Sequence, residues 1–136
     1  MIKKVAVHTT DRVTMDEIIS QLKKNPRFRE VGAIISFTGI VKGVARDGKE
    51  LSKIEMEMDP ARTEERLREI AAEYEKNPLI QEVCIHMSVG ELGVSEVISH
   101  IVVSTICDGP QVGEIFKVVH EILEEVKRTA GLRLKE

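Results

Sequence analysis

The hydrophobic pattern of the chain alternates between short β-branched runs and longer segments with apolar residues at helical spacing. The short runs predict strands over residues 3–8, 32–42, 53–58, 83–89 and 97–106. The helical spacing predicts three helices, after Thr14, after Asp59 and after Pro110. Residues 90–95 are predicted to form a turn region between two of the strands.

The run at residues 32–42, GAIISFTGIVK, is the segment around which we expect the fold to be organised. Its apolar residues leave little polar surface on either side, so the pattern alone also fits a buried helix. Two glycines, the β-branched residues and the short length favour a strand. Gly39 predicts a bulge or a close backbone approach. We interpret the run as a central strand that delivers Lys42, at its end, to a site beside an exposed loop.

Capping residues and prolines mark the predicted helix ends. Thr14, with a glutamate three residues later, has the spacing of a capping box. Asp59 precedes a proline that is suited to the first helical position. Gly131 is suited to end the last helix, and residues 132–136 are predicted either to be disordered or to dock as a final strand.

The predicted order of elements is β-α-β-β-α-β-β-α followed by a tail. Strands that follow one another without an intervening helix imply a mostly antiparallel sheet with helices packed against it, which is an α+β fold. The strictly alternating strand at 53–58 is predicted to pair antiparallel with the strand at 32–42. The length of 136 residues indicates one domain spanning residues 1–136.

Composition narrows the classes of function. The chain has no Trp, one Tyr and three Phe, and its net charge is −3, so we expect no nucleic-acid binding. Its two cysteines have no metal-ligand spacing and suggest no disulfide framework. Together with the lack of a signal sequence or a stretch of membrane-spanning length, this predicts a soluble cytoplasmic protein.

The motifs for nucleotide binding and for metal binding are lacking. The sequence contains neither GxGxxG nor GxxxxGK[ST], and His8, His86, His100 and His120 are scattered without ligand spacing. We interpret the histidines as structural or surface residues. The charged segment at 62–76 mixes glutamates with basic residues, which predicts a salt-bridged solvated helix face.

Cys107 and two lysines are the residues whose positions suggest chemistry. Cys107 lies where a strand gives way to a helix, a place where a thiol can be reactive, although Asp108 beside it opposes thiolate formation. A small buried hydrophobe is the alternative for Cys107, and a thiol enzyme using it stays a third possibility. Lys42 and Lys135 would form a cationic pocket for phosphate or carboxylate if the tail folded back.

Several strings resemble the large, catalytic subunit of molybdopterin synthase (MoaE-like). They are GAIISFTGIVKG at 32–43, IEMEMDP at 54–60, IHMSVGEL at 85–92 and the terminal LKE. The resemblance implies an α/β-hammerhead-type fold and a homodimer that receives a small ubiquitin-like sulfur-carrier subunit at each end. The carrier's C-terminal Gly-Gly thiocarboxylate would give sulfur to cyclic pyranopterin monophosphate in molybdenum cofactor biosynthesis, with no metal or cofactor required.

The resemblance also assigns roles to individual residues. Lys135 matches the family's essential lysine, which makes it the catalytic candidate, and Lys42 stands where the family has an arginine. Cys107-Asp108 replaces a His-Arg pair, and His86 keeps the histidine of a His-Arg-Ile-Gly string; with Lys42, Cys107 and His86 are the substrate-binding candidates. These replacements leave two alternatives open, a sulfurtransferase and a non-catalytic carrier-binding or regulatory homologue.

Overall fold

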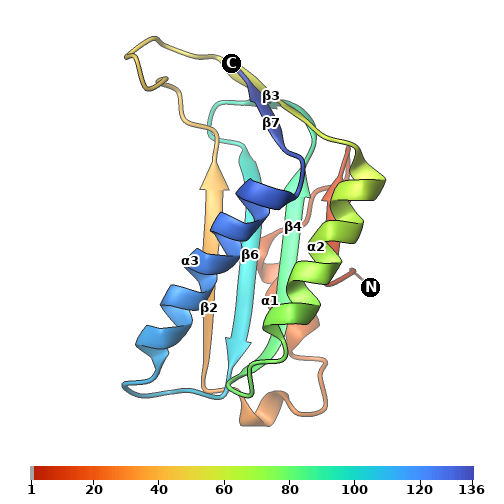
Figure 1. The fold of residues 1–136 in the computed structure, drawn as a ribbon, viewed down its shortest axis with the longest axis vertical. Coiled ribbons are helices and arrows are strands. Elements are labelled where there is room, and N and C mark those ends of the chain that lie inside the picture. Colours follow the sequence, from red (N-terminus) through yellow and green to blue (C-terminus); the bar gives the residue numbers. More distant parts are fainter. Residues whose placement is uncertain (1) are drawn as a thin grey trace.

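A four-stranded sheet forms the centre of the computed structural model, which describes residues 2–136 (Figure 1). Its strands are β1 (Val5–His8), β4 (Ile80–Ser88), β6 (Val97–Thr105) and β2 (Ala33–Ile40), in the order β1-β4-β6-β2. The pair β1 and β4 is parallel, and the other two pairs are antiparallel. The prediction that residues 32–42 form a central strand is therefore wrong in one respect, because β2 lies at the edge of the sheet.

Three helices cover the two faces of this sheet. Helices α2 (Pro60–Tyr74) and α3 (Val112–Thr129) lie next to each other on one face, and α1 (Met15–Leu22) lies on the other (Figure 1). A 3-10 turn, η1 (Phe28–Glu30), leads from α1 toward β2. Each inner strand alternates between two apolar clusters, because successive side chains point to opposite faces. The result is the α+β fold with a mostly antiparallel sheet that the sequence predicts.

The two apolar clusters have different compositions. Val83 and Ile85 of β4 pack under α2 and α3 with Leu67, Ile115 and Ile122. The cluster under α1 is smaller and is formed by Ile18, Leu22, Cys84 and Val102. Because both faces are covered, the middle of β4 and β6 is buried, and the centre of β6 consists of the β-branched residues Ile101, Val102 and Val103.

A second sheet of three short strands lies at one end of the molecule. Its order is β5 (Gly90–Gly93), β3 (Lys53–Glu57) and β7 (Arg133–Lys135), all antiparallel. Two predictions are corrected here, because β3 does not pair with β2 and the predicted turn at 90–95 contains a strand. A separate small core is formed by Val41, Ile54, Met56 and Leu92. This core buries the apolar face of β3. The tail docks as a strand, which was one of its two predicted states.

The predicted helix ends and the predicted bulge are confirmed. Thr14 and Glu17 form a complete capping box, and the Asp59 side chain accepts a hydrogen bond from the amide of Arg62. The register between β2 and β6 shifts at Gly39. Gly131 follows α3 with φ 74°, a left-handed conformation that glycine adopts at little cost and that turns the tail back toward β3.

The approach of Gly32 to the segment after β6 generates a stability prediction. A Cβ atom at Gly32 would lie 2.7 Å from the carbonyl oxygen of Cys107 and 2.7 Å from the Cβ of Asp108. Gly32→Ala should therefore lower the free energy of unfolding by about 1–3 kcal/mol, because the backbone must shift. Gly109→Ala, whose Cβ would have no neighbour within 4 Å, is the control for urea unfolding. Equal effects of the two substitutions would contradict this packing constraint.

Candidate functional site

Lys135 is delivered to the second sheet by the turn after α3. The Thr63 hydroxyl of α2 donates a hydrogen bond to the carbonyl of Ala130 at 2.7 Å, which fixes the end of α3. The left-handed Gly131 then directs residues 133–135 along β3, where Lys135 lies opposite Glu55 in register. Secondary structure thus fixes the backbone of Lys135, although the residue stands near the end of the chain.

The ammonium of Lys135 is held by a carboxylate of the neighbouring strand. Its Nζ lies 2.9 Å from Oε1 of Glu57, and the two side chains are 63% and 37% exposed. The ammonium lowers the pKa of Glu57, and this carboxylate in turn raises the pKa of Lys135. Lys135 is therefore a cation at neutral pH, suited to bind an anion and unsuited to act as a free amine.

The two faces of the three-stranded sheet have opposite character. One face is charged and carries Lys53 with Glu91 at 3.1 Å as well as the Lys135 pair. The other face borders an apolar groove of about 580 Å³. The groove is lined by residues of β2, β3, β6, α3 and β7: Phe37, Ile40, Met56, Ile98, Leu123 and Leu134 among them. Strand alternation places Leu134 and Lys135 on opposite faces of β7.

Among residues 2–136, Lys42 does not line the cavity beside Lys135. Lys42 lies two residues beyond the end of β2 and is exposed. The residue before it, Val41, makes backbone hydrogen bonds with Ser95 and Glu96. The cavity of about 130 Å³ beside Lys135 is lined instead by Lys53, Ile54, Glu55, Glu91, Lys135 and Glu136. Its charges are mixed, so this cavity is not by itself the cationic pocket of Lys42 and Lys135 that we expected if the tail folded back.

Cys107 lies at the opposite end of the four-stranded sheet from Lys42. Ala33 at the start of β2 pairs with Thr105, while Ile40 at its end pairs with Val97. Eight residues of extended chain span roughly 25 Å, which separates the Cys107 end from the Lys42 end. Cys107 is 4% exposed, and its Sγ lies 3.9 Å from Oε1 of Gln111. Burial of this degree fits the small buried hydrophobe that was the alternative for Cys107.

His86 belongs to a polar row that crosses the four-stranded sheet on the side of α1. Its Nδ1 lies 2.8 Å from Nε2 of His8, and it stands opposite His100 in register. The row continues from Nδ1 of His100 to the Thr38 hydroxyl at 2.9 Å. Sequence reasoning named the three histidines but neither Thr38 nor the row, because the register that aligns β1, β4, β6 and β2 is set by tertiary pairing.

The surroundings of the row favour uncharged histidines. His86 is 2% exposed, and burial together with His8 and His100 lowers its pKa to about 4. Burial and His8 also lower the pKa of His100. A cavity of about 20 Å³, room for one water, lies between the row and Arg12. No set of three histidine, cysteine or carboxylate side chains within residues 2–136 is arranged to hold a metal ion.

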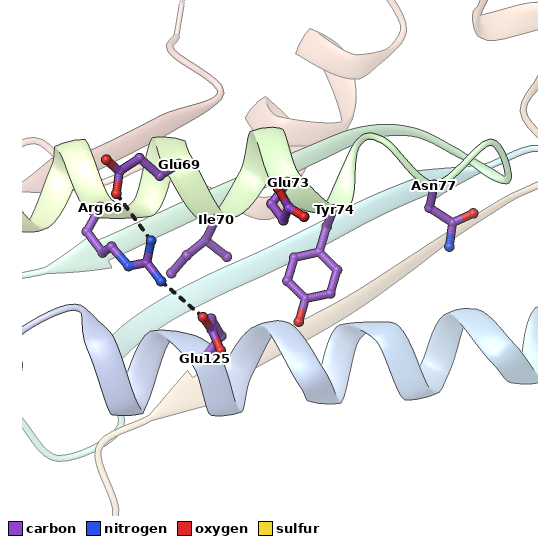
Figure 2. A pocket seen from close by; sticks show the side chains of 7 residues that line it. All are labelled: Arg66, Glu69, Ile70, Glu73, Tyr74, Asn77 and Glu125. Atoms are coloured by element: carbon purple, nitrogen blue, oxygen red, sulfur yellow. Dashed lines mark hydrogen bonds and ion pairs between the residues drawn. The ribbon is translucent and has the colours of Figure 1, made fainter.

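The groove between α2 and α3 is a salt-bridged surface. Figure 2 shows Arg66 reaching from α2 to Glu69 at 3.2 Å and across to Glu125 of α3 at 3.0 Å. Burial, with Glu121 and Glu125, raises the pKa of the Tyr74 hydroxyl that points toward α3. The predicted ion pairing of residues 62–76 is present. The pair of Arg66 with Glu69 lies within α2, and the pair of Arg66 with Glu125 connects α2 to α3.

Several solved structures have the same fold as this chain. Molybdopterin synthase from Staphylococcus aureus matches with TM-score 0.80 and 18% identity, over 98% of this chain and 90% of that chain. Molybdopterin cofactor biosynthesis protein E from Burkholderia multivorans ATCC 17616 matches with TM-score 0.78 and 25% identity, over 100% and 88%. The complex of subunits 1 and 2 of molybdopterin-converting factor from Helicobacter pylori 26695 contains a chain that matches with TM-score 0.72 and 13% identity, over 97% and 83%.

A comparison of the sequence with family models identifies the family more specifically than the shared fold does. The model of the MoaE protein family matches residues 8–129, which is most of the chain. The chain therefore belongs to the MoaE family, as the resemblance of its strings predicts. No curated protein sequence matches it significantly. None of the helices within residues 2–136 is long and apolar enough to cross a membrane.

The histidine row generates a prediction on pH dependence. Folding lowers the pKa of His86 from its ordinary value of 6.5 to about 4, so between these pH values the unfolded chain binds more protons. The free energy of unfolding should fall as the pH drops through this window, by on the order of 3 kcal/mol from this residue. The free energy of unfolding, measured by urea unfolding across this pH range, should depend less steeply on pH for His86→Gln than for wild type. His120→Gln, at an exposed histidine of α3, is the control and should leave the slope unchanged.

Proposed function

We propose that this protein serves molybdenum cofactor biosynthesis as the large subunit of a molybdopterin synthase. It would direct sulfur from the thiocarboxylate of a small carrier protein to cyclic pyranopterin monophosphate. The family match over residues 8–129 carries the proposal. The complex of two subunits solved for the Helicobacter pylori protein supports a small partner subunit for this chain as well.

Lys135 is the residue to which we assign the central role in the chemistry. It lies outside the matched range, so its assignment rests on the terminal LKE string and on its fixed place in β7. A protonated lysine can hold an anionic thiocarboxylate and stabilise the charge that develops on the acyl oxygen during transfer. The raised pKa of Lys135 favours this electrostatic role over nucleophilic attack by a neutral amine.

We further propose a homodimer in which one site takes residues from both chains. The four site candidates are spread over both ends of the sheet, with Lys42 and Cys107 at opposite ends of the β2–β6 pair. If they serve one site, a second copy must supply the Cys107 end, as a twofold arrangement allows. Exposed apolar side chains at both ends support such contacts: Ile40, Val44, Val94 and Leu134 at one end, and Ile106 and Phe116 at the other.

A reconstituted reaction tests the assignment of Lys135. With a thiocarboxylated carrier and the precursor, Lys135→Ala should lower dithiolene formation at least about 100-fold, because the charge that faces the acyl group is lost. Lys53→Ala removes another exposed cation of the same sheet face and should retain activity within about threefold. Equal activity of wild type and Lys135→Ala would refute the role of Lys135.

Mixing two inactive variants tests the shared site. If the Cys107 thiol serves the shared site, Cys107→Ser and Lys135→Ala should each lose activity in homodimers. Co-expressed in equal amounts, half of the dimers contain one chain of each kind, and each of these has one site with both native residues. Activity should then recover to about one quarter of wild type, whereas a site built within one chain would give none. Full activity of Cys107→Ser would show that the thiol is not needed.

The non-catalytic alternative is favoured by one observation, the charge balance around Lys135. Its ammonium is paired with Glu57, and the cavity beside it contains carboxylates as well as cations. A homologue that only binds the carrier would retain carrier binding in Lys135→Ala and would show no turnover with either form. Turnover that depends on Lys135 would eliminate this alternative.

A further inference from the structure

Strand β3 places two carboxylates near Lys135, those of Glu55 and Glu57, and the ammonium pairs with Glu57. Glu55 lies directly opposite Lys135 in the β3–β7 register, and Glu57 lies diagonally, opposite Arg133. Side chains at odd positions of β3 share one face, so both carboxylates are within reach of a long side chain. The ammonium nevertheless lies at Glu57, 2.9 Å from Oε1.

The geometry of this pair makes it suited to exchange. Oε1 of Glu57 is shielded from solvent, and the Lys135 ammonium 2.9 Å away is the cation that compensates its charge. This carboxylate therefore keeps the lysine side chain over β3 as long as no other anion takes its place. The partner amine is itself largely exposed, so another anion can approach it from solvent.

We propose that Glu57 is a built-in counter-ion that occupies Lys135 until an anionic ligand displaces it. Glu57 is then a positioning residue: it holds the lysine side chain over β3 in the free protein and competes with a ligand carboxylate, thiocarboxylate or phosphate for the same ammonium. The inference deepens the proposed function and rests on it for the identity of the anion. The exchange itself is a property of the free chain.

Methyl-lysine NMR tests the exchange without a partner or turnover. Lysine amines are ¹³C-methylated, the Lys135 signal is assigned with Lys135→Arg, and inorganic phosphate is the probe. In Glu57→Gln the Lys135 signal should titrate at lower pH than in wild type, and phosphate should half-saturate its shift at about threefold lower concentration. Glu55→Gln removes the same charge two residues away and is the matched control, and Lys53, paired with Glu91, is the internal reference.

The outcomes separate the inference from the proposed function. The inference is overturned if the Lys135 titration is unchanged in Glu57→Gln, if phosphate binds this variant no more tightly than wild type, or if Glu55→Gln has an equal effect. A successful NMR result with an inactive reconstituted reaction would overturn the sulfur-transfer function and leave the counter-ion role standing.

Discussion

The antiparallel pairing of β6 with β4 on one side and β2 on the other is the constraint on which the rest of the structure depends. β6 is covered on both faces, and Ile101, Val102 and Val103 at its centre are fully buried. This pairing aligns His100 with His86 and with Thr38, which creates the polar row. The antiparallel pairing also places the ends of β6 and β2 at opposite ends of the four-stranded sheet. The chain leaves β6 toward Cys107 at one end, and it leaves β2 at the other end, next to the three-stranded sheet. The separation of the site candidates is thus a consequence of strand direction.

The site at the second sheet depends on a weaker set of contacts. Three residues of β7 pair with β3, and all three are exposed, so little apolar burial holds the strand that carries Lys135. The left-handed Gly131 and the hydrogen bond from Thr63 to Ala130 fix where the tail begins, and the Glu57 ion pair fixes where the lysine side chain ends. A short edge strand anchored at one end suits a binding element, because a ligand can exchange contacts there without disturbing the core.

Membership in the MoaE family and the altered site residues fit together in this picture. The family match covers the three helices and strands β2 to β6, which are specified by many apolar positions and tolerate change at individual polar ones. Cys107 and Asp108 stand after β6, outside any strand or helix; Cys107 is buried in the core under α2 and α3, whereas Asp108 is exposed. The fold therefore constrains Asp108 little, whereas a change at Cys107 has to preserve the packing of the core.

Local patterns in the sequence determined the helices, most of the strands, the caps at Thr14 and Asp59 and the bulge at Gly39, because each depends on neighbours within a few residues. The strings also indicated the family and pointed to Lys135. Tertiary structure alone decided that β2 is an edge strand, that β3 pairs with β5 and β7, that the histidines form a row, and that Lys135 is paired with Glu57. These features depend on register between strands distant in sequence, and the alternation of apolar residues is compatible with several pairings until the two cores select one.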